Sequence, residues 1–139
     1  MSSSRTGGAK HGVSEYLLDA SALLALVNDE VGAERVATAI GEAAISAVNL
    51  TEVVGKLHER GMPIDAAREA VSGLGLRVIP FAESLVYATA GLRVATRKLG
   101  LSLADRACLA TAKALALPVL TTDRSWLKVK ASVKVICIR

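Results

Sequence analysis

Short apolar runs alternate along the chain with longer segments whose apolar residues recur every three or four positions. The short runs are typical of buried strands, and the longer segments are typical of amphipathic helices. Strands are expected at residues 16–18, 43–46, 76–79, 118–121 and 133–138. Because strands and helices alternate, we predict an α/β domain of three layers (α/β/α), with helices on both faces of a mostly parallel central sheet.

The longest predicted helix spans residues 83–99, where Leu85, Leu92 and Leu99 belong to one apolar stripe of three-then-four spacing. A short helical turn is expected at Trp126 and Leu127. The remaining helices are expected at residues 21–27, 33–40, 49–60, 63–72 and 102–115.

The first 14 residues contain no apolar segment, so they do not resemble a secretory signal. We interpret residues 1–14 as a disordered leader or an expression remnant and assign the fold to residues 15–139. His11 lies in the leader and receives no role. No uncharged apolar run reaches the roughly 18 residues that a membrane span needs, so no membrane association is expected.

Charge and composition narrow the classes of partner. The 17 Lys and Arg residues exceed the 13 Asp and Glu residues by four, a mild excess that permits a nucleic-acid partner without requiring one. Aromatic residues make up only 3% of the chain, which argues against an RNA-binding module that stacks bases on aromatic side chains. Cys108 and Cys137 lie in apolar surroundings outside any CxxC motif, which favours a reduced, cytoplasmic protein.

Four acids occupy boundaries between predicted elements. Asp19 and Asp123 follow strands, whereas Glu52 and Asp105 lie in the first turns of predicted helices. In a parallel sheet, the carboxyl ends of the strands and the starts of the following helices lie at the same edge. We therefore expect Asp19, Glu52 and Asp123 to meet at one edge of the sheet, and Asp105 to join them if its helix starts on that side.

Each acid also has a purely structural interpretation. Asp19 is suited to cap a helix, and Asp123 is suited to a turn. Two segments, 49–52 and 102–105, resemble capping boxes that end in Glu52 and Asp105. Capping alone does not explain all four at one edge, because an acid at a helix start gains only about 0.3–1 kcal/mol while clustered carboxylates repel each other. An all-oxygen cluster without His or Cys favours Mg²⁺ or Mn²⁺ over Zn²⁺.

Four motifs carry a resemblance to a known family. In order, they are LLDASAL (17–23), NLTEV (49–53), LADRACLA (103–110) and LTTDRSW (120–126). Together they resemble a PIN domain, and most of all the VapC toxin ribonucleases of bacterial toxin–antitoxin pairs. The resemblance covers about residues 15–139.

The resemblance implies a metal-dependent endoribonuclease that cleaves RNA with a metal-activated water. Asp19, Glu52, Asp105 and Asp123 match the catalytic quartet that holds Mg²⁺ or Mn²⁺. A VapB-like antitoxin that blocks the acidic pocket, and a homodimer, are the implied protein partners. Ser21, Asn49 and Thr122 match the polar positions that support the quartet. The family often has another acid two positions after Asp123, where this chain has Ser125, so one tightly held ion is expected rather than two.

Several charged or large residues remain open to two interpretations. Arg106 and Arg124 each follow an acid of the quartet and would either bind RNA phosphates or form surface ion pairs. Arg93 and Arg97 share a helix face that would either extend a basic strip or remain solvated. Trp126 is interpreted as a packing residue. Four other acids are expected to face solvent: Glu30, Glu34, Asp65 and Glu69.

Two other functions remain open from the sequence. One is a PIN-type nuclease outside toxin–antitoxin biology, acting in RNA processing or on structured DNA. The other is an inert binding module whose acids are structural. A small antitoxin reading frame beside the gene would exclude the first, and binding of Mn²⁺ would exclude the second.

Overall fold

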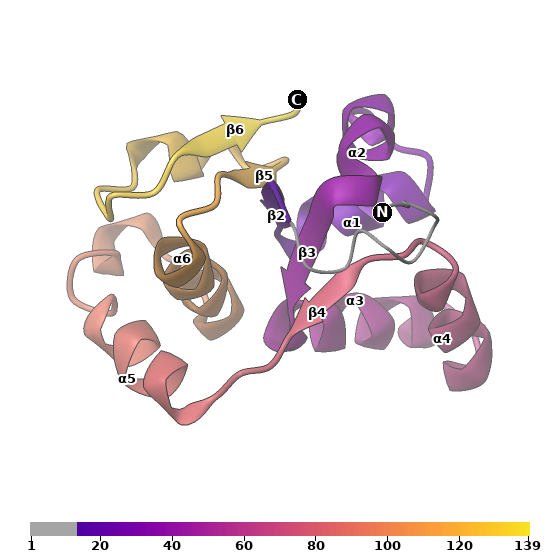
Figure 1. Cartoon of the computed structure of the whole chain (residues 1–139), viewed down its shortest axis with the longest axis horizontal. Helices are drawn as coiled ribbons and strands as arrows, with labels where there is room; N and C mark the ends of the chain where they lie inside the picture. The colour runs from indigo at the N-terminus through magenta and orange to yellow at the C-terminus, as the bar shows by residue number, and fades with distance from the viewer. Residues whose placement is uncertain (1–13) are drawn as a thin grey trace, which may run out of the picture.

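The computed structural model describes residues 14–139 and contains a five-stranded sheet in the order β4-β3-β2-β5-β6 (Figure 1). Every pair of neighbouring strands is parallel, which confirms the predicted α/β class. The predicted leader lies outside the described residues, apart from Ser14. The strands are β2 (Tyr16–Leu18), β3 (Ala43–Ser46), β4 (Arg77–Ile79), β5 (Val119–Thr121) and β6 (Val135–Cys137).

Strand β2 lies at the centre of the sheet, and its two leucines separate the two halves of the core. Leu18 pairs with Ile45 on one side and with Leu120 on the other. Successive side chains of a strand point to opposite faces. Leu18 accordingly packs in a buried cluster with the helices that precede β4, whereas Leu17 packs against the later helix that contains Leu109. Helices therefore cover both faces, as predicted.

Six α-helices and three short 3₁₀ helices complete the described part of the chain. The α-helices are α1 (Ala20–Val27), α2 (Ala33–Ala39), α3 (Ala47–Glu59), α4 (Ile64–Ser72), α5 (Glu83–Gly91) and α6 (Leu103–Leu115). The 3₁₀ helices are η2 (Ile40–Glu42), η3 (Arg97–Leu99) and η4 (Arg124–Lys128). Trp126 lies in η4 with only 1% of its surface exposed, which confirms its packing role.

The prediction of one long helix over residues 83–99 is wrong. Helix α5 ends at Gly91, and turns lead from there to η3. The amides of Leu92 and Arg93 bond to carbonyls three residues back rather than four, which tightens the chain out of the α-helical path. Glycine has a low helix propensity, so the helix ends there although the apolar stripe continues. The longest helices described are α3 and α6, with 13 residues each.

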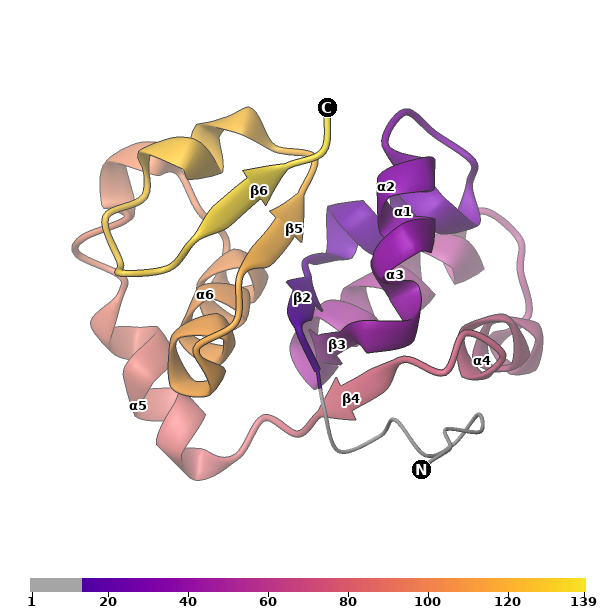
Figure 2. The same cartoon turned by 45° about the horizontal axis from the view of Figure 1, so that its top comes forward.

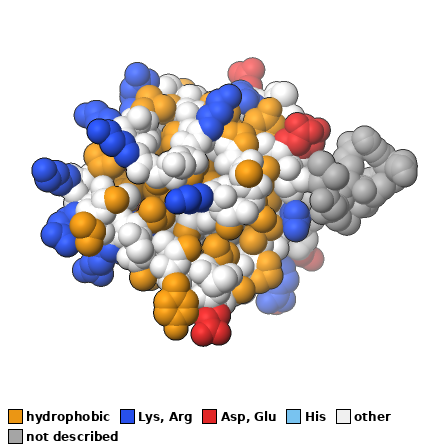
Figure 3. Space-filling model, turned by 60° about the vertical axis from the view of Figure 1, so that its left-hand side comes forward, with side chains coloured by type: hydrophobic (Ala, Val, Ile, Leu, Met, Phe, Trp, Pro, Cys, Tyr) orange, Lys and Arg blue, Asp and Glu red, His pale blue; other side chains and the backbone are white. Residues whose placement is uncertain are grey.

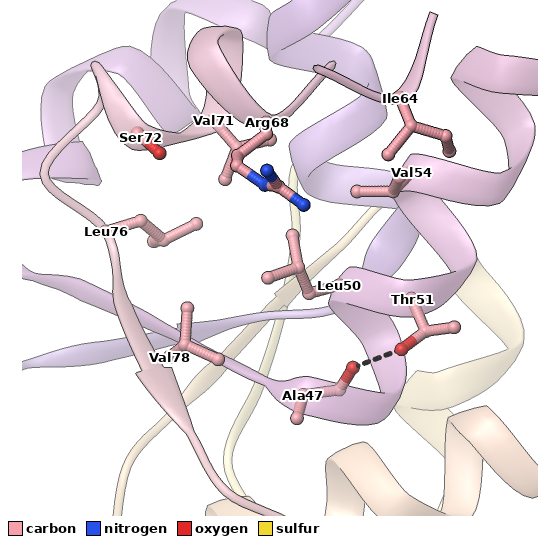
Figure 4. Close-up of a pocket in the computed structure, with 10 residues that line it drawn as sticks. All are labelled: Ala47, Leu50, Thr51, Val54, Ile64, Arg68, Val71, Ser72, Leu76 and Val78. Carbon is pink, nitrogen blue, oxygen red and sulfur yellow. Dashed lines mark hydrogen bonds between the residues drawn. The ribbon is translucent and has the colours of Figure 1, made fainter. Parts of the chain in front are cut away.

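Helices α3 and α4 and the edge strand β4 enclose an apolar groove of about 530 Å³. Figure 4 shows Leu50, Leu76 and Val78 around it, with the guanidinium group of Arg68 pointing toward its centre. Arg68 also pairs with Asp65 on the exposed side of α4, at 3.3 Å.

No helix in residues 14–139 has the length and apolar character that crossing a bilayer requires. Both cysteines are free; Cys108 is buried and Cys137 is half-buried.

Charge is divided unequally between the two sides of the molecule. Residues 14–82, which we call the acidic half, carry ten Asp or Glu and five Lys or Arg. Residues 83–139, the basic half, carry three Asp or Glu and ten Lys or Arg. Figures 1 and 2 show α1 to α4 on one side and α5, α6 and β6 on the other. Figure 3 looks onto the basic side, where Lys and Arg side chains surround apolar ones.

Candidate active site

One pocket of about 270 Å³ is lined by all four acids of the predicted quartet: Asp19, Glu52, Asp105 and Asp123. Asp19 directly follows β2, and Asp123 lies two residues beyond the end of β5. Glu52 projects from α3, and Asp105 lies in the first turn of α6. The structure thus brings together four residues that are separated by up to 104 positions in the sequence.

Asp19 is the most deeply buried of the four, with 4% of its surface exposed. Its Oδ1 accepts hydrogen bonds from the Ser21 hydroxyl at 2.7 Å and from the Ala22 amide at 2.8 Å. The second of these bonds makes Asp19 the N-cap of α1. Its Oδ2 accepts one bond, from the hydroxyl of Thr121 at 2.5 Å. Since a carboxylate has about four lone pairs, this cap retains capacity for a further partner.

Burial raises the pKa of Asp19 from 3.8 to about 6, although the hydrogen bonds from Thr121, Ser21 and Ala22 act in the opposite direction. The negative charge of Asp105 adds to the increase. No ion pair in residues 14–139 neutralises Asp19. Burial also raises the pKa of the Cys108 thiol well above its usual value, with smaller contributions from Asp19 and Asp105. The pocket therefore favours the arrival of positive charge.

Thr121 is a site residue that the sequence did not reveal. Its buried hydroxyl donates to Asp19 and accepts from the Asp123 amide at 3.1 Å, so it links two acids. Leu120 pairs with Leu18, and this register places Thr121 beside Asp19. Thr122, the predicted supporting residue, lines the pocket and donates its backbone amide to the Ser21 hydroxyl at 3.0 Å.

Asp105 closes the predicted capping box at the start of α6. The Ser102 hydroxyl accepts from the Asp105 amide at 3.1 Å, and Asp105 Oδ2 accepts from the Ser102 amide at 3.0 Å. The Asn49 side chain donates to the carbonyl of Ala104 at 3.1 Å and so joins α3 to the first turn of α6. Asn49 is 1% exposed, and its Oδ1 has no partner among the described residues.

The second predicted capping box, residues 49–52, is wrong. Helix α3 begins at Ala47, and Ser46 is its N-cap through a 3.2 Å bond from the Val48 amide. Glu52 therefore lies in the second turn rather than the first. Its side chain is 35% exposed, and Lys56 Nζ lies 4.0 Å from its Oε2. Glu52 is thus held far less firmly than Asp19.

Ser125 supports Asp123. Asp123 caps η4, and its Oδ1 accepts from the Ser125 amide at 2.9 Å and from the Ser125 hydroxyl at 2.7 Å. The position where the resemblance would place another acid is therefore occupied by a hydrogen-bond donor to the last acid of the quartet. This arrangement orients Asp123 without adding charge.

Three cations also line the pocket, and sequence reasoning assigned none of them to the site: Lys56, Arg60 and Arg139. A signal for the first two was present, since they follow Glu52 by four and eight residues on one helix face. Arg139 Nη2 pairs with Glu30 at 3.0 Å. Glu30 is exposed, as expected, but it also lines the pocket.

Arg106 and Arg124, the two arginines left open between binding RNA and forming surface ion pairs, lie outside the residues that line this pocket. Arg124 Nη1 donates to the carbonyl of Arg139 at 3.0 Å. Arg106 lines a different pocket, between α5 and α6. Their proposed contact with RNA stays a prediction.

The donor set suits a divalent cation. In the described part of the chain, no three His, Cys, Asp or Glu side chains are already arranged as they would be around one ion. The pocket nevertheless contains four carboxylates, and the most buried of them, Asp19, forms no ion pair with any of the described residues. Oxygen donors of this kind fit Mg²⁺ or Mn²⁺, for which the carboxylates would have to move closer together.

The fold and the pocket can be compared with known proteins. No curated protein matches the sequence. A toxin–antitoxin complex from Klebsiella pneumoniae aligns with a TM-score of 0.70 at 20% identity, over 90% of this chain and 98% of that chain. The DNA-bound VapBC from Salmonella typhimurium aligns with a TM-score of 0.71 at 17% identity, over 91% of this chain and 100% of that chain.

VapC20 from Mycobacterium tuberculosis, described as a toxin that cleaves the sarcin–ricin loop, aligns with a TM-score of 0.68 at 18% identity. The alignment covers 82% of this chain and 94% of that chain. At such identities, these structures establish a shared fold. At the sequence level, residues 16–132 match the family model for the PIN domain, which spans most of the chain. From the strand order, the four converging acids and this match, we conclude that the chain belongs to the PIN domain family.

Proposed function

We propose that the protein is a VapC-like toxin, a metal-dependent endoribonuclease that hydrolyses RNA phosphodiester bonds. The observation that carries the proposal is the convergence of four carboxylates from four parts of the chain in one pocket, where Asp19 is buried and forms no ion pair within residues 14–139. Membership of a nuclease family whose members generally use divalent metal ions supports it. So does the likeness to solved toxin structures.

The residues of the pocket divide into two groups under this proposal. Asp19, Glu52, Asp105 and Asp123 hold Mg²⁺ or Mn²⁺, while Ser21, Thr121 and Ser125 fix the orientation of the carboxylates. A bound cation would neutralise the phosphodiester and lower the pKa of a nearby water. Lys56 and Arg60, on the same wall as Glu52, offer positive charge to the flanking phosphates.

The proposed partners follow from the same relatives. Two of the similar structures are toxin–antitoxin or VapBC complexes. We infer a VapB-like antitoxin that covers the acidic pocket with a basic side chain, a homodimeric toxin and a cytoplasmic location. Asp19 forms no ion pair with any of residues 14–139, so a basic side chain of the antitoxin would supply the positive charge that this carboxylate lacks.

The direct test is cleavage of single-stranded RNA by the wild-type protein and by Asp19→Asn and Asp105→Asn in Mg²⁺ or Mn²⁺. We expect wild-type cleavage that EDTA abolishes and that both variants lack. Unchanged cleavage by both variants would refute the mechanism. Cleavage of structured DNA in preference to RNA would favour a PIN nuclease outside toxin–antitoxin biology. Absence of Mn²⁺ binding to the wild type in calorimetry would indicate an inert module.

A further inference from the structure

A pocket of about 470 Å³ opens between α5 and the first turn of α6. We call it the α5–α6 pocket; its lining includes Phe81, Val86, Thr89, Arg93, Leu103 and Arg106. Arg106, which lines it, directly follows Asp105, which lines the pocket of the four acids. The first turn of α6 thus contributes to both pockets, and an extended strand that passes over this turn would meet both.

The charge of the α5–α6 pocket is uncompensated. Arg93 and Arg106 line it, and no Asp or Glu is among its lining residues. None of the ion pairs formed within residues 14–139 includes either arginine. Two like charges brought into one pocket without a counterion favour binding of an anion, and a guanidinium group matches a phosphate through paired hydrogen bonds.

Thr89 provides a second, independent observation. It is 1% exposed and lines the pocket, yet its hydroxyl has no hydrogen-bond partner among the described residues. The hydroxyls of Thr96 and Thr111 instead donate to carbonyls four residues back, each at 2.8 Å. Buried polar groups are normally satisfied, so the Thr89 hydroxyl indicates a missing polar partner at this pocket.

The remaining wall is apolar and open. Val86 is 44% exposed and Leu103 is 61% exposed, and Phe81 adds an aromatic ring to the lining. A second copy of the chain could cover these side chains, but it would bring two basic halves together. Figure 3 shows Lys and Arg side chains along much of the rim of this side of the molecule, with apolar side chains between them. The charge therefore favours an anionic ligand that also has an apolar, planar part.

We propose that the α5–α6 pocket is a nucleotide subsite, which holds one nucleotide of the RNA strand next to the scissile phosphate. Arg93 and Arg106 bind its phosphate, and Phe81, Val86 and Leu103 contact its base. The identification of the strand as substrate rests on the proposed function. Under this proposal, Arg93 binds the phosphate together with Arg106 and is not part of an extended basic strip with Arg97.

The test measures binding of a fluorescently labelled ten-nucleotide RNA to the full chain in EDTA, where cleavage cannot occur, by anisotropy. Arg93→Gln removes one phosphate contact. Ala90 also lines the pocket, so Ala90→Phe fills it while keeping its charge. Arg97→Gln is the matched control, because it removes the same charge from outside the pocket. We expect about tenfold weaker binding for the first two variants and less than about twofold for the control. An equal loss in Arg97→Gln would overturn the subsite in favour of diffuse electrostatic attraction.

Two further measurements distinguish an RNA strand from a free nucleotide as the ligand of this pocket. Adenosine monophosphate, titrated against the wild type and Ala90→Phe by NMR, should perturb Thr89 and Arg93 in the wild type only. Binding much weaker than that of the RNA supports a subsite for a strand, and comparable binding supports a free nucleotide as the ligand. If neither probe binds, the proposal is overturned. It is also overturned if Ala90→Phe dissociates a dimer in sedimentation while RNA affinity stays unchanged.

The outcome also separates this inference from the proposed function. A wild type that binds RNA through Arg93 but cleaves nothing in Mn²⁺ would refute the nuclease and leave the subsite standing. A wild type that cleaves RNA with the same KM as Arg93→Gln and Ala90→Phe would refute the subsite and leave the nuclease standing.

Discussion

The acidic and basic halves each supply two of the four acids of the predicted quartet, although the compositions of the halves are opposite. Ten acids lie in the acidic half, and only Asp19, Glu30 and Glu52 line the acidic pocket. Three acids lie in the basic half, and two of them, Asp105 and Asp123, line it. An acid in basic surroundings is therefore the more informative signal, because it is least explained by the general solvation of the surface.

The two halves also differ in how they hold their acids. In the acidic half, Asp19 is buried under three hydrogen bonds, while Glu52 is partly exposed and only loosely paired with Lys56. In the basic half, Asp105 and Asp123 are both held by amides of their own turns. Three of the four acids are thus oriented before any ion arrives, which reduces the reorganisation that binding requires.

The largest expected effect comes from comparing an acid of the basic half that lines the pocket with one that does not. Asp105→Asn keeps an oxygen that can accept from the Ser102 amide, so the cap and fold survive, but it removes a charge from the pocket. We expect a loss of roughly 10³-fold in kcat/KM for RNA cleavage. Glu83 is the one acid of this half that lies outside the pocket, so kcat/KM of Glu83→Gln should stay within about twofold of the wild-type value. Similar losses in both variants would mean that net charge, not position, governs activity.

The next effect concerns the stability of the metal-free protein. The pKa of Asp19 is higher in the folded chain, at about 6, than its ordinary value of 3.8, so the folded state binds this proton more tightly. The free energy of unfolding should therefore fall as the pH rises from about 4 to about 6, by about 3 kcal/mol in total.

Urea denaturation in EDTA, compared between the wild type and Asp19→Asn, isolates this contribution from other titrating groups. We expect the variant to gain stability relative to the wild type across that pH range. Mn²⁺ should then stabilise only the wild type. Parallel curves for the two proteins would contradict the burial of an uncompensated charge at Asp19.

A smaller effect tests the contact between the two halves. Gly32, between α1 and α2, has φ +99°, and a Cβ there would lie 2.8 Å from Ile138 Cδ1 and 3.0 Å from the Ile138 carbonyl oxygen. Gly61 has φ +107° with open space around it, so Gly61→Ala reports backbone strain alone. We expect a cost of about 1 kcal/mol for Gly61→Ala and about 2 kcal/mol more for Gly32→Ala in thermal or urea unfolding. Equal losses of stability in the two variants would show that Ile138 moves away from position 32 without a measurable cost.

The smallest effect distinguishes two neighbouring threonines. Thr121→Val removes the hydroxyl that donates to Asp19, so the pKa of Asp19 should rise further and kcat/KM should fall about tenfold. The acid limb of the pH–rate profile should move to higher pH. Thr122→Val keeps the backbone amide that donates to Ser21 and should have less than about a twofold effect. A larger loss of kcat/KM in Thr122→Val than in Thr121→Val would show that Thr122, not Thr121, supports the acids of the pocket.

Local patterns were sufficient to predict most of this architecture. The buried strands, the alternation with helices and the capping box at Ser102 and Asp105 depend on residues close in sequence, and all are present in the structure. Asp19, Glu52 and Asp123 could be placed at one edge because a parallel sheet brings the carboxyl ends of its strands together, whereas the place of Asp105 depended on where its helix starts. The helix predicted over residues 83–99 failed because its stripe continues past Gly91, where the backbone does not.

The remainder required tertiary information. Thr121 is recognised only from the register of β5 against β2. The partnership of Arg93 with Arg106 depends on the packing of α5 against α6, and that of Arg139 with Glu30 depends on where β6 leads the chain. Such contacts join residues 13 to 109 positions apart, and no local periodicity encodes them.

The amides that orient the acids have a spectroscopic consequence. The N–H groups of Ala22, Ser102 and Ser125 donate to Asp19, Asp105 and Asp123, respectively. A cation that withdraws electron density from these carboxylates weakens the three hydrogen bonds and moves the amide proton resonances upfield. The backbone thereby contains a separate reporter for each of the three acids, and the order in which the resonances shift during a titration reveals which carboxylates the ion engages first.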